Sequence, residues 1–91
     1  MEEIIQTDFY KVYPNPASTN VIVELKNENF ASNYSVVVYS LLGKQVIRKE
    51  GVSAKYFVLD ISELIDGAYF INIETNKNKS SKVFIKNSKS G

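Results

Sequence analysis

Short stretches of this chain alternate between hydrophobic and polar residues with a period of two, which is typical of half-buried β-strands. Val21, Val23 and Leu25, for example, would share one face of such a strand. The chain holds nineteen Val or Ile residues against five Leu, and β-branched side chains favour strands over helices. Turn-forming residues recur about every ten positions, as in all-β sandwiches and barrels. The pattern predicts seven strands, at residues 8–13, 20–26, 34–41, 45–49, 55–61, 68–75 and 82–86.

Proline and glycine mark where the first predicted strands end. Pro14 and Pro16 flank Asn15 and stop the first strand, because neither proline can donate a hydrogen bond to a ladder. Gly43, followed by Lys44, can adopt a positive φ and so allows a tight hairpin turn. These two turns should fix the backbone rigidly at both places.

The loop before the sixth predicted strand carries a second group of structural residues. Residues 62–65 are expected to form one helical turn that is capped by Ser62 and stopped at Gly67. Asp60, just before this turn, is expected to be stabilised by the local backbone dipole. Tyr69 can return its hydroxyl to the upstream backbone, as in the tyrosine corner of sandwich folds.

Seven short strands, with no helix long enough for a parallel crossover, predict an all-β antiparallel fold. We expect a seven-stranded, two-sheet β-sandwich of immunoglobulin-like or jelly-roll-like character, with a small barrel as the alternative. At 91 residues the chain makes one domain. The strands place that domain at residues 8–86, with a flexible tail at 87–91.

The composition argues against catalysis. The chain contains no Cys and no His, so a Ser or Thr nucleophile would lack its usual base. Its three Asp residues show no calcium-loop spacing, and its four Gly residues form no phosphate-binding loop. We predict no enzymatic activity, no metal and no cofactor.

With 11 basic and 10 acidic residues the net charge is +1, which excludes a uniformly basic nucleic-acid binder. No apolar stretch approaches the 18 residues of a transmembrane helix.

The lysines gather towards the end of the chain. From Lys77 onward there are five Lys residues and no acid, whereas residues 1–76 carry six basic and ten acidic groups. Alternation puts Lys82, Phe84 and Lys86 on one face of the last strand. If the opposite face, with Val83, packs on the core, Phe84 points outward between two lysines. The lysines would then either protect a sheet edge from aggregation or dock an acidic partner.

Four segments, in this order, resemble the motifs of a known family. They are Tyr-Pro-Asn-Pro-Ala at 13–17, Val-Tyr-Ser-Leu-Leu-Gly-Lys-Gln-Val at 38–46, Leu-Asp-Ile-Ser-Glu-Leu-Ile-Asp-Gly-Ala-Tyr-Phe-Ile at 59–71, and Lys-Val-Phe-Ile-Lys at 82–86. Together they resemble the C-terminal sorting domains of the type IX (Por) secretion system, of the commoner type A class. The resemblance covers about residues 9–86.

This resemblance implies a non-catalytic β-sandwich that directs a cargo protein across the outer membrane and is usually removed by a sortase. Its implied partners are the outer-membrane translocon, a shuttle protein, the sortase and an upstream cargo domain, to which residues 1–7 would be the linker. The protein would pass through the periplasm to the cell surface or the medium. Translocon recognition would involve Lys82, Phe84 and Lys86. The family-motif positions are Pro14, Asn15, Pro16, Gly43, Lys44, Asp60, Gly67 and Tyr69.

Two other function classes compete with export. A fibronectin-like or carbohydrate-binding accessory module of a secreted enzyme would be favoured by three coplanar exposed tyrosines on one sheet. A structural subunit that polymerises by strand exchange would form an incomplete sandwich or a dimer.

Overall fold

The fold is given by a computed structural model of the chain, which describes residues 10–26, 33–75 and 79–89. These residues contain seven strands, and none of them lies in a helix long enough to cross a membrane. The strands are β1 (Tyr10–Tyr13), β2 (Asn20–Leu25), β3 (Tyr34–Ser40), β4 (Gln45–Val52), β5 (Tyr56–Asp60), β6 (Gly67–Glu74) and β7 (Lys79–Lys86).

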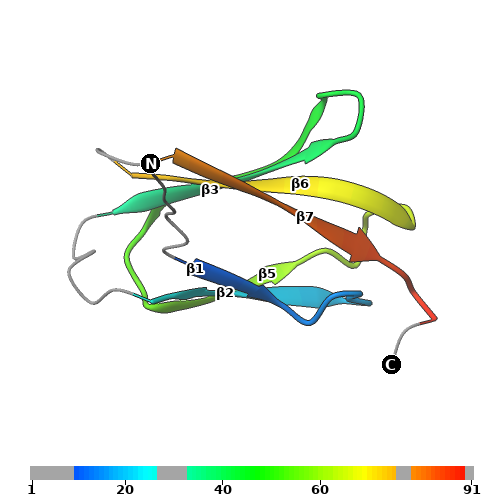
Figure 1. Cartoon of the computed structure of the whole chain (residues 1–91), viewed down its shortest axis with the longest axis horizontal. Helices are drawn as coiled ribbons and strands as arrows, with labels where there is room; N and C mark the ends of the chain where they lie inside the picture. The colour runs from blue at the N-terminus through cyan, green and yellow to red at the C-terminus, as the bar shows by residue number, and fades with distance from the viewer. Residues whose placement is uncertain (1–9, 27–32, 76–78, 90–91) are drawn as a thin grey trace, which may run out of the picture.

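The strands form two sheets that pack face to face (Figure 1). One sheet has the order β1-β2-β5 and the other the order β4-β3-β6-β7. Every strand pairing is antiparallel, so the predicted antiparallel sandwich is confirmed. β1 and β7 lie on the near side of the view in Figure 1, whereas β5 lies on the far side.

The core fills the space between the two sheets, because each strand turns alternate side chains inward. On β2, Val21 and Val23 are fully buried and Leu25 nearly so, as the alternation predicts. The facing sheet contributes its own inward row. The buried hydrophobic cluster consists of Tyr10, Ala17, Val21, Val23, Leu25, Tyr34, Val36, Val38, Leu59, Ile61, Tyr69, Ile71, Ile73 and Phe84.

Two buried tyrosines keep their hydroxyls hydrogen-bonded to backbone oxygens. The Tyr34 hydroxyl donates to the carbonyl of Ala54 at 2.7 Å, and burial raises the pKa of Tyr34 above its usual 10.0. The Tyr10 hydroxyl lies 3.3 Å from the carbonyl oxygens of both Ile71 and Ser80. A buried hydroxyl without such a partner would cost stability. Tyr10 thus ties β1 to the facing sheet, and Tyr34 ties β3 to the segment between β4 and β5.

Two strands are longer than the sequence predicts. β4 continues to Val52 and includes Gly51, whose φ of +71° interrupts the regular extended backbone. A register shift between Tyr34 and Val36 on β3 accommodates the extra residue, as a β-bulge does. β7 begins at Lys79, three residues before its predicted start. Glycine and serine at these places looked like turn residues in the sequence.

The helical turn expected at residues 62–65 is a single tight turn. The Leu64 N–H donates to the Ile61 carbonyl at 3.0 Å, and no helix follows. Ser62 is not its cap. The Asp60 carboxylate instead accepts hydrogen bonds from the Ser62 N–H, at 2.9 Å, and from the Ser62 hydroxyl, at 2.7 Å. Asp60, and not Ser62, thus accepts the backbone N–H at the start of the turn, which is the role of a cap.

Candidate functional site

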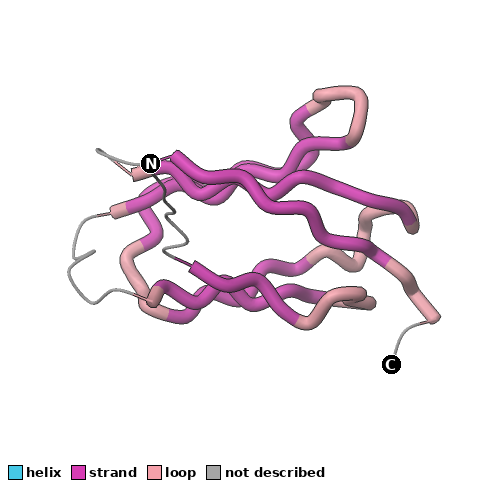
Figure 2. Tube along the Cα trace, viewed as in Figure 1, coloured by secondary structure: helices cyan, strands magenta, loops and turns pink. Residues whose placement is uncertain are grey.

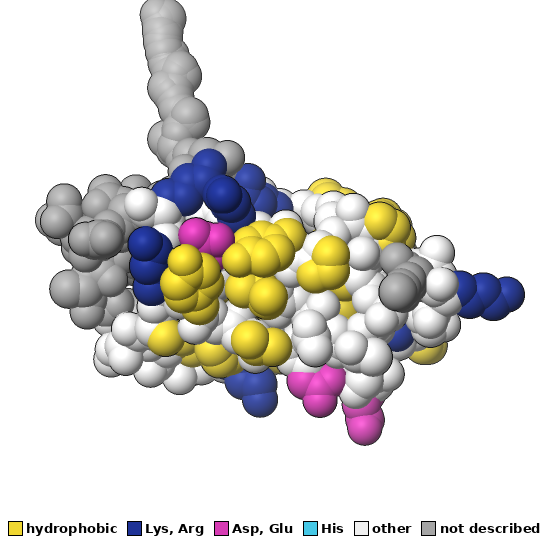
Figure 3. Space-filling view, turned by 90° about the horizontal axis from the view of Figure 1, so that it is seen from below, with side chains coloured by type: hydrophobic (Ala, Val, Ile, Leu, Met, Phe, Trp, Pro, Cys, Tyr) yellow, Lys and Arg dark blue, Asp and Glu magenta, His cyan; other side chains and the backbone are white. Residues whose placement is uncertain are grey.

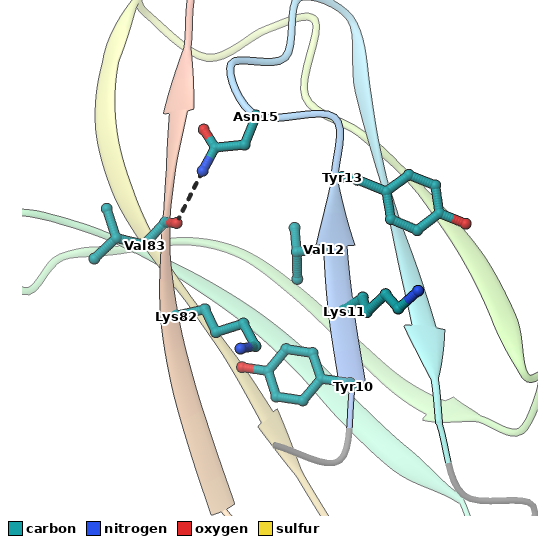
Figure 4. A pocket seen from close by; sticks show the side chains of 7 residues that line it. All are labelled: Tyr10, Lys11, Val12, Tyr13, Asn15, Lys82 and Val83. Atoms are coloured by element: carbon teal, nitrogen blue, oxygen red, sulfur yellow. Dashed lines mark hydrogen bonds between the residues drawn. The ribbon is translucent and has the colours of Figure 1, made fainter. Parts of the chain in front are cut away.

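The first and last motifs come together at one edge of the sandwich. The peptide bonds before Pro14 and Pro16 are both cis, and the loop that they form lies beside β7 (Figure 4). Asn15, between the prolines, bonds to the backbone of β7 with its side chain. Its Oδ1 accepts from the Ile85 N–H at 2.9 Å, and its Nδ2 donates to the Val83 carbonyl at 3.4 Å.

The contact continues through Ala17, which forms an isolated parallel bridge with Lys86. The Ala17 N–H donates to the Ile85 carbonyl at 2.9 Å, and the Asn87 N–H donates to the Ala17 carbonyl at 2.8 Å. Ala17 is fully buried. We call Asn15–Ala17 together with its partners Val83–Asn87 the edge clamp. It covers the outer edge of β7, where unpaired backbone groups would otherwise invite another strand.

The last strand does not have the orientation that would place Phe84 outward. Phe84 is fully buried, whereas Val83 is 50% exposed and Ile85 is 38% exposed. The Phe84 ring stacks on Tyr69, with centroids 5.7 Å apart and an angle of 22° between the ring planes. The face that carries Lys82, Phe84 and Lys86 therefore points into the sandwich, so Phe84 is not part of an exposed recognition patch.

The two lysines on this inward face hold their charges at the margins of the core. The Lys82 Nζ lies 5.3 Å from the centre of the Tyr10 ring, in a cation–π contact. Lys86 is only 4% exposed, and its Nζ lies 3.7 Å from Oδ1 of Asp66. A long lysine stem can cover apolar surface while its ammonium group reaches a partner. Both lysines thus cover the margins of the core and do not form an open basic strip.

Asp66 joins this cluster to the segment after β7. It accepts hydrogen bonds from the Ser88 N–H and the Ser88 hydroxyl, each at 3.1 Å. Together with the bond between Asn87 and Ala17, these contacts hold the first residues of the predicted tail against the domain.

A shallow groove of about 440 Å³ lies beside the edge clamp (Figure 4). Its lining residues are Tyr10, Lys11, Val12, Tyr13, Asn15, Lys82 and Val83. It combines tyrosine rings with two lysines and contains no carboxylate. Within residues 10–26, 33–75 and 79–89, no group of three or more His, Cys, Asp or Glu side chains is placed to hold a metal ion. The groove offers contacts for binding and no pair of groups for acid–base chemistry.

The third motif forms a corner that locks the entry to β6. The Tyr69 hydroxyl donates to the Ile65 carbonyl at 2.6 Å, which confirms the predicted return of this hydroxyl to the upstream backbone. Gly67 has a φ of +150°, where a β-carbon would be strained. The hydrogen bonds from the Ser62 hydroxyl and backbone lower the pKa of Asp60 below its usual 3.8. The corner is a structural device, because its polar groups bond to one another.

The second motif forms the β3–β4 hairpin turn. The Gly43 N–H donates to the Ser40 carbonyl at 2.9 Å, and the Ser40 N–H donates to the Lys44 carbonyl at 2.8 Å. Gly43 has a φ of +87°, as the sequence predicts. Leu41 and Leu42 occupy the two central positions of the turn, and Leu42 is 97% exposed.

The outer face of the β1-β2-β5 sheet carries an apolar patch (Figure 3). Tyr13, Ile22 and Val58 lie side by side across its three strands. Tyr56 is 57% exposed beside them. The Tyr13 hydroxyl donates to Oε1 of Glu24 at 2.9 Å, and this bond is the main reason why the pKa of Tyr13 is raised. Only two tyrosines share this face among the described residues, which is fewer than the three that would favour a carbohydrate-binding module.

Comparison with known proteins gives a consistent result. A family profile described as a secretion system C-terminal sorting domain matches residues 11–87. The chain belongs to this family. The sorting domain is also 30% identical, over 79 residues, to beta-agarase A of Zobellia galactanivorans. The match covers 87% of this chain and 14% of that protein, so the chain spans about a seventh of the length of the curated relative.

The family's motifs have different places in this sorting domain. The first and last meet in the edge clamp, the third makes the tyrosine corner, and the second forms a separate hairpin (Figure 1). Sequence reasoning missed Ala17 and Asp66 as parts of these contacts. Ala17 follows directly on the proline loop and Asp66 precedes Gly67, but only the fold brings both beside Lys86.

Proposed function

We propose that this sorting domain directs a cargo protein, carried on its N-terminal side, across the outer membrane by the type IX secretion system. The observation that carries the proposal is the family match over nearly all the described fold, at residues 11–87. We assign no catalytic step to the domain itself. The polar side chains of Asn15 at the clamp and Tyr69 at the corner bond to the domain's own backbone, and no cluster of described residues offers a metal site.

The proposed partners are an outer-membrane translocon, a shuttle protein and a sortase that cuts on the N-terminal side of β1. The cargo would pass through the periplasm before it reaches the cell surface or the medium. A folded domain suits this task, because one translocon can recognise the same surface on unrelated cargo. The hydrogen bonds of the edge clamp and of the corner hold that surface in one shape, which lowers the entropy lost on binding.

Within this function, we propose that Lys82, Phe84 and Lys86 act by closing the sandwich and not by touching the translocon. Phe84 is fully buried against Tyr69, and Lys86 is 4% exposed. A partner could reach Phe84 only if β7 left the sheet. Recognition then falls to outward residues elsewhere on the domain.

The function is tested by fusing residues 1–91 behind a periplasmic reporter enzyme in a bacterium that has a type IX system. The reporter is expected on the cell surface or in the medium. In a matched strain without the translocon, it should stay in the periplasm. Retention in the periplasm of the intact strain would contradict the proposal. A reporter fused to a same-sized β-sandwich from a cytoplasmic protein controls for leakage.

A further inference from the structure

The β3–β4 hairpin presents two leucines that contribute nothing visible to the fold. Leu41 is 60% exposed and Leu42 is 97% exposed, and neither packs against the buried core cluster. The hairpin rises away from the body of the sandwich (Figures 1 and 2). We call Leu41 and Leu42 the leucine tip.

The turn does not require leucine at these positions. Central turn positions favour residues such as Asn, Asp, Ser, Pro or Gly, which suit the backbone or the solvent. Gly43 already supplies the positive φ that the turn needs. Exposed apolar groups raise the risk of aggregation, so an adjacent pair at a projecting tip calls for a role outside the fold.

The backbone that carries the leucine tip is held by hydrogen bonds. The bond from Gly43 N–H to Ser40 closes the turn, and the Lys44 N–H donates a further bond to the Ser40 hydroxyl at 3.2 Å. A turn that is already closed in this way loses little backbone freedom on binding. Apolar anchors that fill a pocket in this way provide most of the energy in many protein interfaces.

The charges around the tip indicate what kind of pocket it fits. Lys44 follows the tip after one glycine, and no acidic residue lies between Tyr39 and Lys49 along the chain. Farther along β4, Arg48 already pairs with Glu50, so Lys44 is the cation that the tip presents. An apolar pocket with an acidic rim would match both the leucines and Lys44. A membrane is a poorer fit, because the tip has no aromatic residue. It also has less hydrocarbon than a myristoyl chain, which by itself binds bilayers only marginally.

We propose that the leucine tip inserts into an acidic-rimmed apolar pocket on a protein of the export machinery. This inference rests on the proposed export function and names the contact through which the domain is recognised. The edge clamp and the tyrosine corner then support the domain, while the leucine tip is what the partner touches.

The test uses the same reporter fusion with both tip residues changed, Leu41→Ser and Leu42→Ser. The surface reporter is expected to fall at least about tenfold, as for loss of an interface anchor, with uncut precursor accumulating in the periplasm. Ile65→Ser is the matched control, because Ile65 is 81% exposed and lies outside the hairpin. It should leave export within about twofold of the original.

Folding is checked separately by thermal unfolding of the purified 91-residue chain, which should be unchanged by either substitution set. If the double variant melts early, Leu42→Ser alone carries the test, because that side chain is almost wholly in solvent. Lys44→Glu tests whether the partner's pocket has an acidic rim. This variant is expected to lower export severalfold, and unaltered export would contradict the acidic rim.

The outcomes separate the two proposals. If the unchanged fusion is not exported, the sorting function itself fails. If the unchanged fusion and the double variant are exported equally, the leucine tip is not the contact and the sorting function stands. Purified domain is also mixed with vesicles of phosphatidylethanolamine and phosphatidylglycerol, where no binding is expected. Binding that depends on the two leucines would replace the protein pocket with a membrane.

Discussion

Asn15 does with its side chain what a neighbouring strand does with its backbone. Its amide offers one acceptor and one donor to β7, at Ile85 and Val83. Asparagine has this pair of groups at the spacing of a peptide unit, whereas aspartate has only acceptors. The Pro-Asn-Pro loop therefore serves to present this amide at the sheet edge.

Replacing Asn15 with Ala should lower the free energy of unfolding by about 1–2 kcal/mol, because two hydrogen bonds are lost at the sheet edge. Asn15→Asp keeps the acceptor for the Ile85 N–H, so its loss should be smaller. Urea denaturation of the purified chain measures both. Equal stability of the Ala variant and the original would show that the clamp contributes nothing.

Lys86 and Asp66 form an unequal ion pair, in which the lysine is buried and the aspartate side chain is 51% exposed. Asp66→Asn leaves the buried ammonium without its counter-charge and should cost about 1–2 kcal/mol, less than a fully buried pair because solvent screens Asp66. Lys86→Met keeps the apolar stem and should change stability by less than about 1 kcal/mol. Ser88→Ala removes the hydroxyl bond to Asp66 and leaves the ion pair with Lys86, so it separates the two contributions to stability. A Met variant less stable than the Asn variant would refute this assignment.

Asp60 links the corner loop to pH. Because the Ser62 bonds lower its pKa in the folded state below 3.8, ionised Asp60 stabilises the fold above that pH. The contribution disappears as the pH falls through the lowered folded-state pKa. The stability difference between the original and Asp60→Asn should therefore shrink between pH 5 and about pH 2, as followed by thermal unfolding. A constant difference would mean that the carboxylate charge is irrelevant.

At the level of elements, the sequence predicted strand positions better than strand faces. Strand β2 alternates clearly, so the pattern alone placed Val21 and Val23 on one face, and that face is buried. β7 carries Phe84 on one face and Val83 and Ile85 on the other, and hydrophobicity does not decide between them. The deciding fact is that the Tyr69 ring is available to stack on Phe84, which depends on pairing with β6.

The edge clamp could not be predicted from the sequence for a related reason. Its partners, Asn15 and Ile85, are 70 positions apart, and no local pattern connects a proline loop to a distant strand edge. The tyrosine corner joins two residues only four positions apart, Ile65 and Tyr69, and was predictable. Gly51 shows the opposite error, because a glycine taken as a turn lies within β4 at a bulge.

The pairing of β5 makes a sharp prediction about proline. Bonds from Leu25 N–H to Lys55 and from Ile61 N–H to Thr19 show which backbone groups face β2. By alternation, the Phe57 N–H faces β2 and the Val58 N–H faces away. Val58→Pro should therefore lower the free energy of unfolding by about 1 kcal/mol or less relative to Val58→Ala, since N–H groups on the open side of an edge strand tolerate proline.

Phe57→Pro should be less stable than Phe57→Ala by about 3 kcal/mol or more in the free energy of unfolding, because proline removes a hydrogen bond between β5 and β2. Chemical denaturation of the four variants measures both differences. Similar proline costs at the two positions would contradict the strand phase described for β5.

At the scale of the whole molecule, β7 closes a fold that has no disulfide to hold it. It pairs with β6 along its whole length, supplies Phe84 to the core and receives the clamp. A fragment ending at residue 78 should therefore be unfolded, with its circular dichroism and amide chemical-shift dispersion lost. A folded fragment would show that β7 is an accessory strand.

This role changes how two obvious export experiments are understood. Deleting residues 82–91 removes the closing strand, so retained cargo would report an unfolded domain and not a missing contact. Reversing the charges of Lys82 and Lys86 has the same drawback, because both side chains lie on the inward face. Substitutions at exposed positions separate folding from recognition more cleanly.

Because β7 is the last strand of the domain, the sandwich can close only after β7 has been synthesised. The ribosome releases Asn15 and Ala17 long before the β7 residues to which they bond, so the sandwich stays incomplete until β7 emerges. A precursor that a stop codon or a protease cuts short before β7 would lack the closed sandwich that the proposed sorting function requires. This would hold even if its cargo domain were folded. The clamp thus couples closure of this sandwich to synthesis of its last strand.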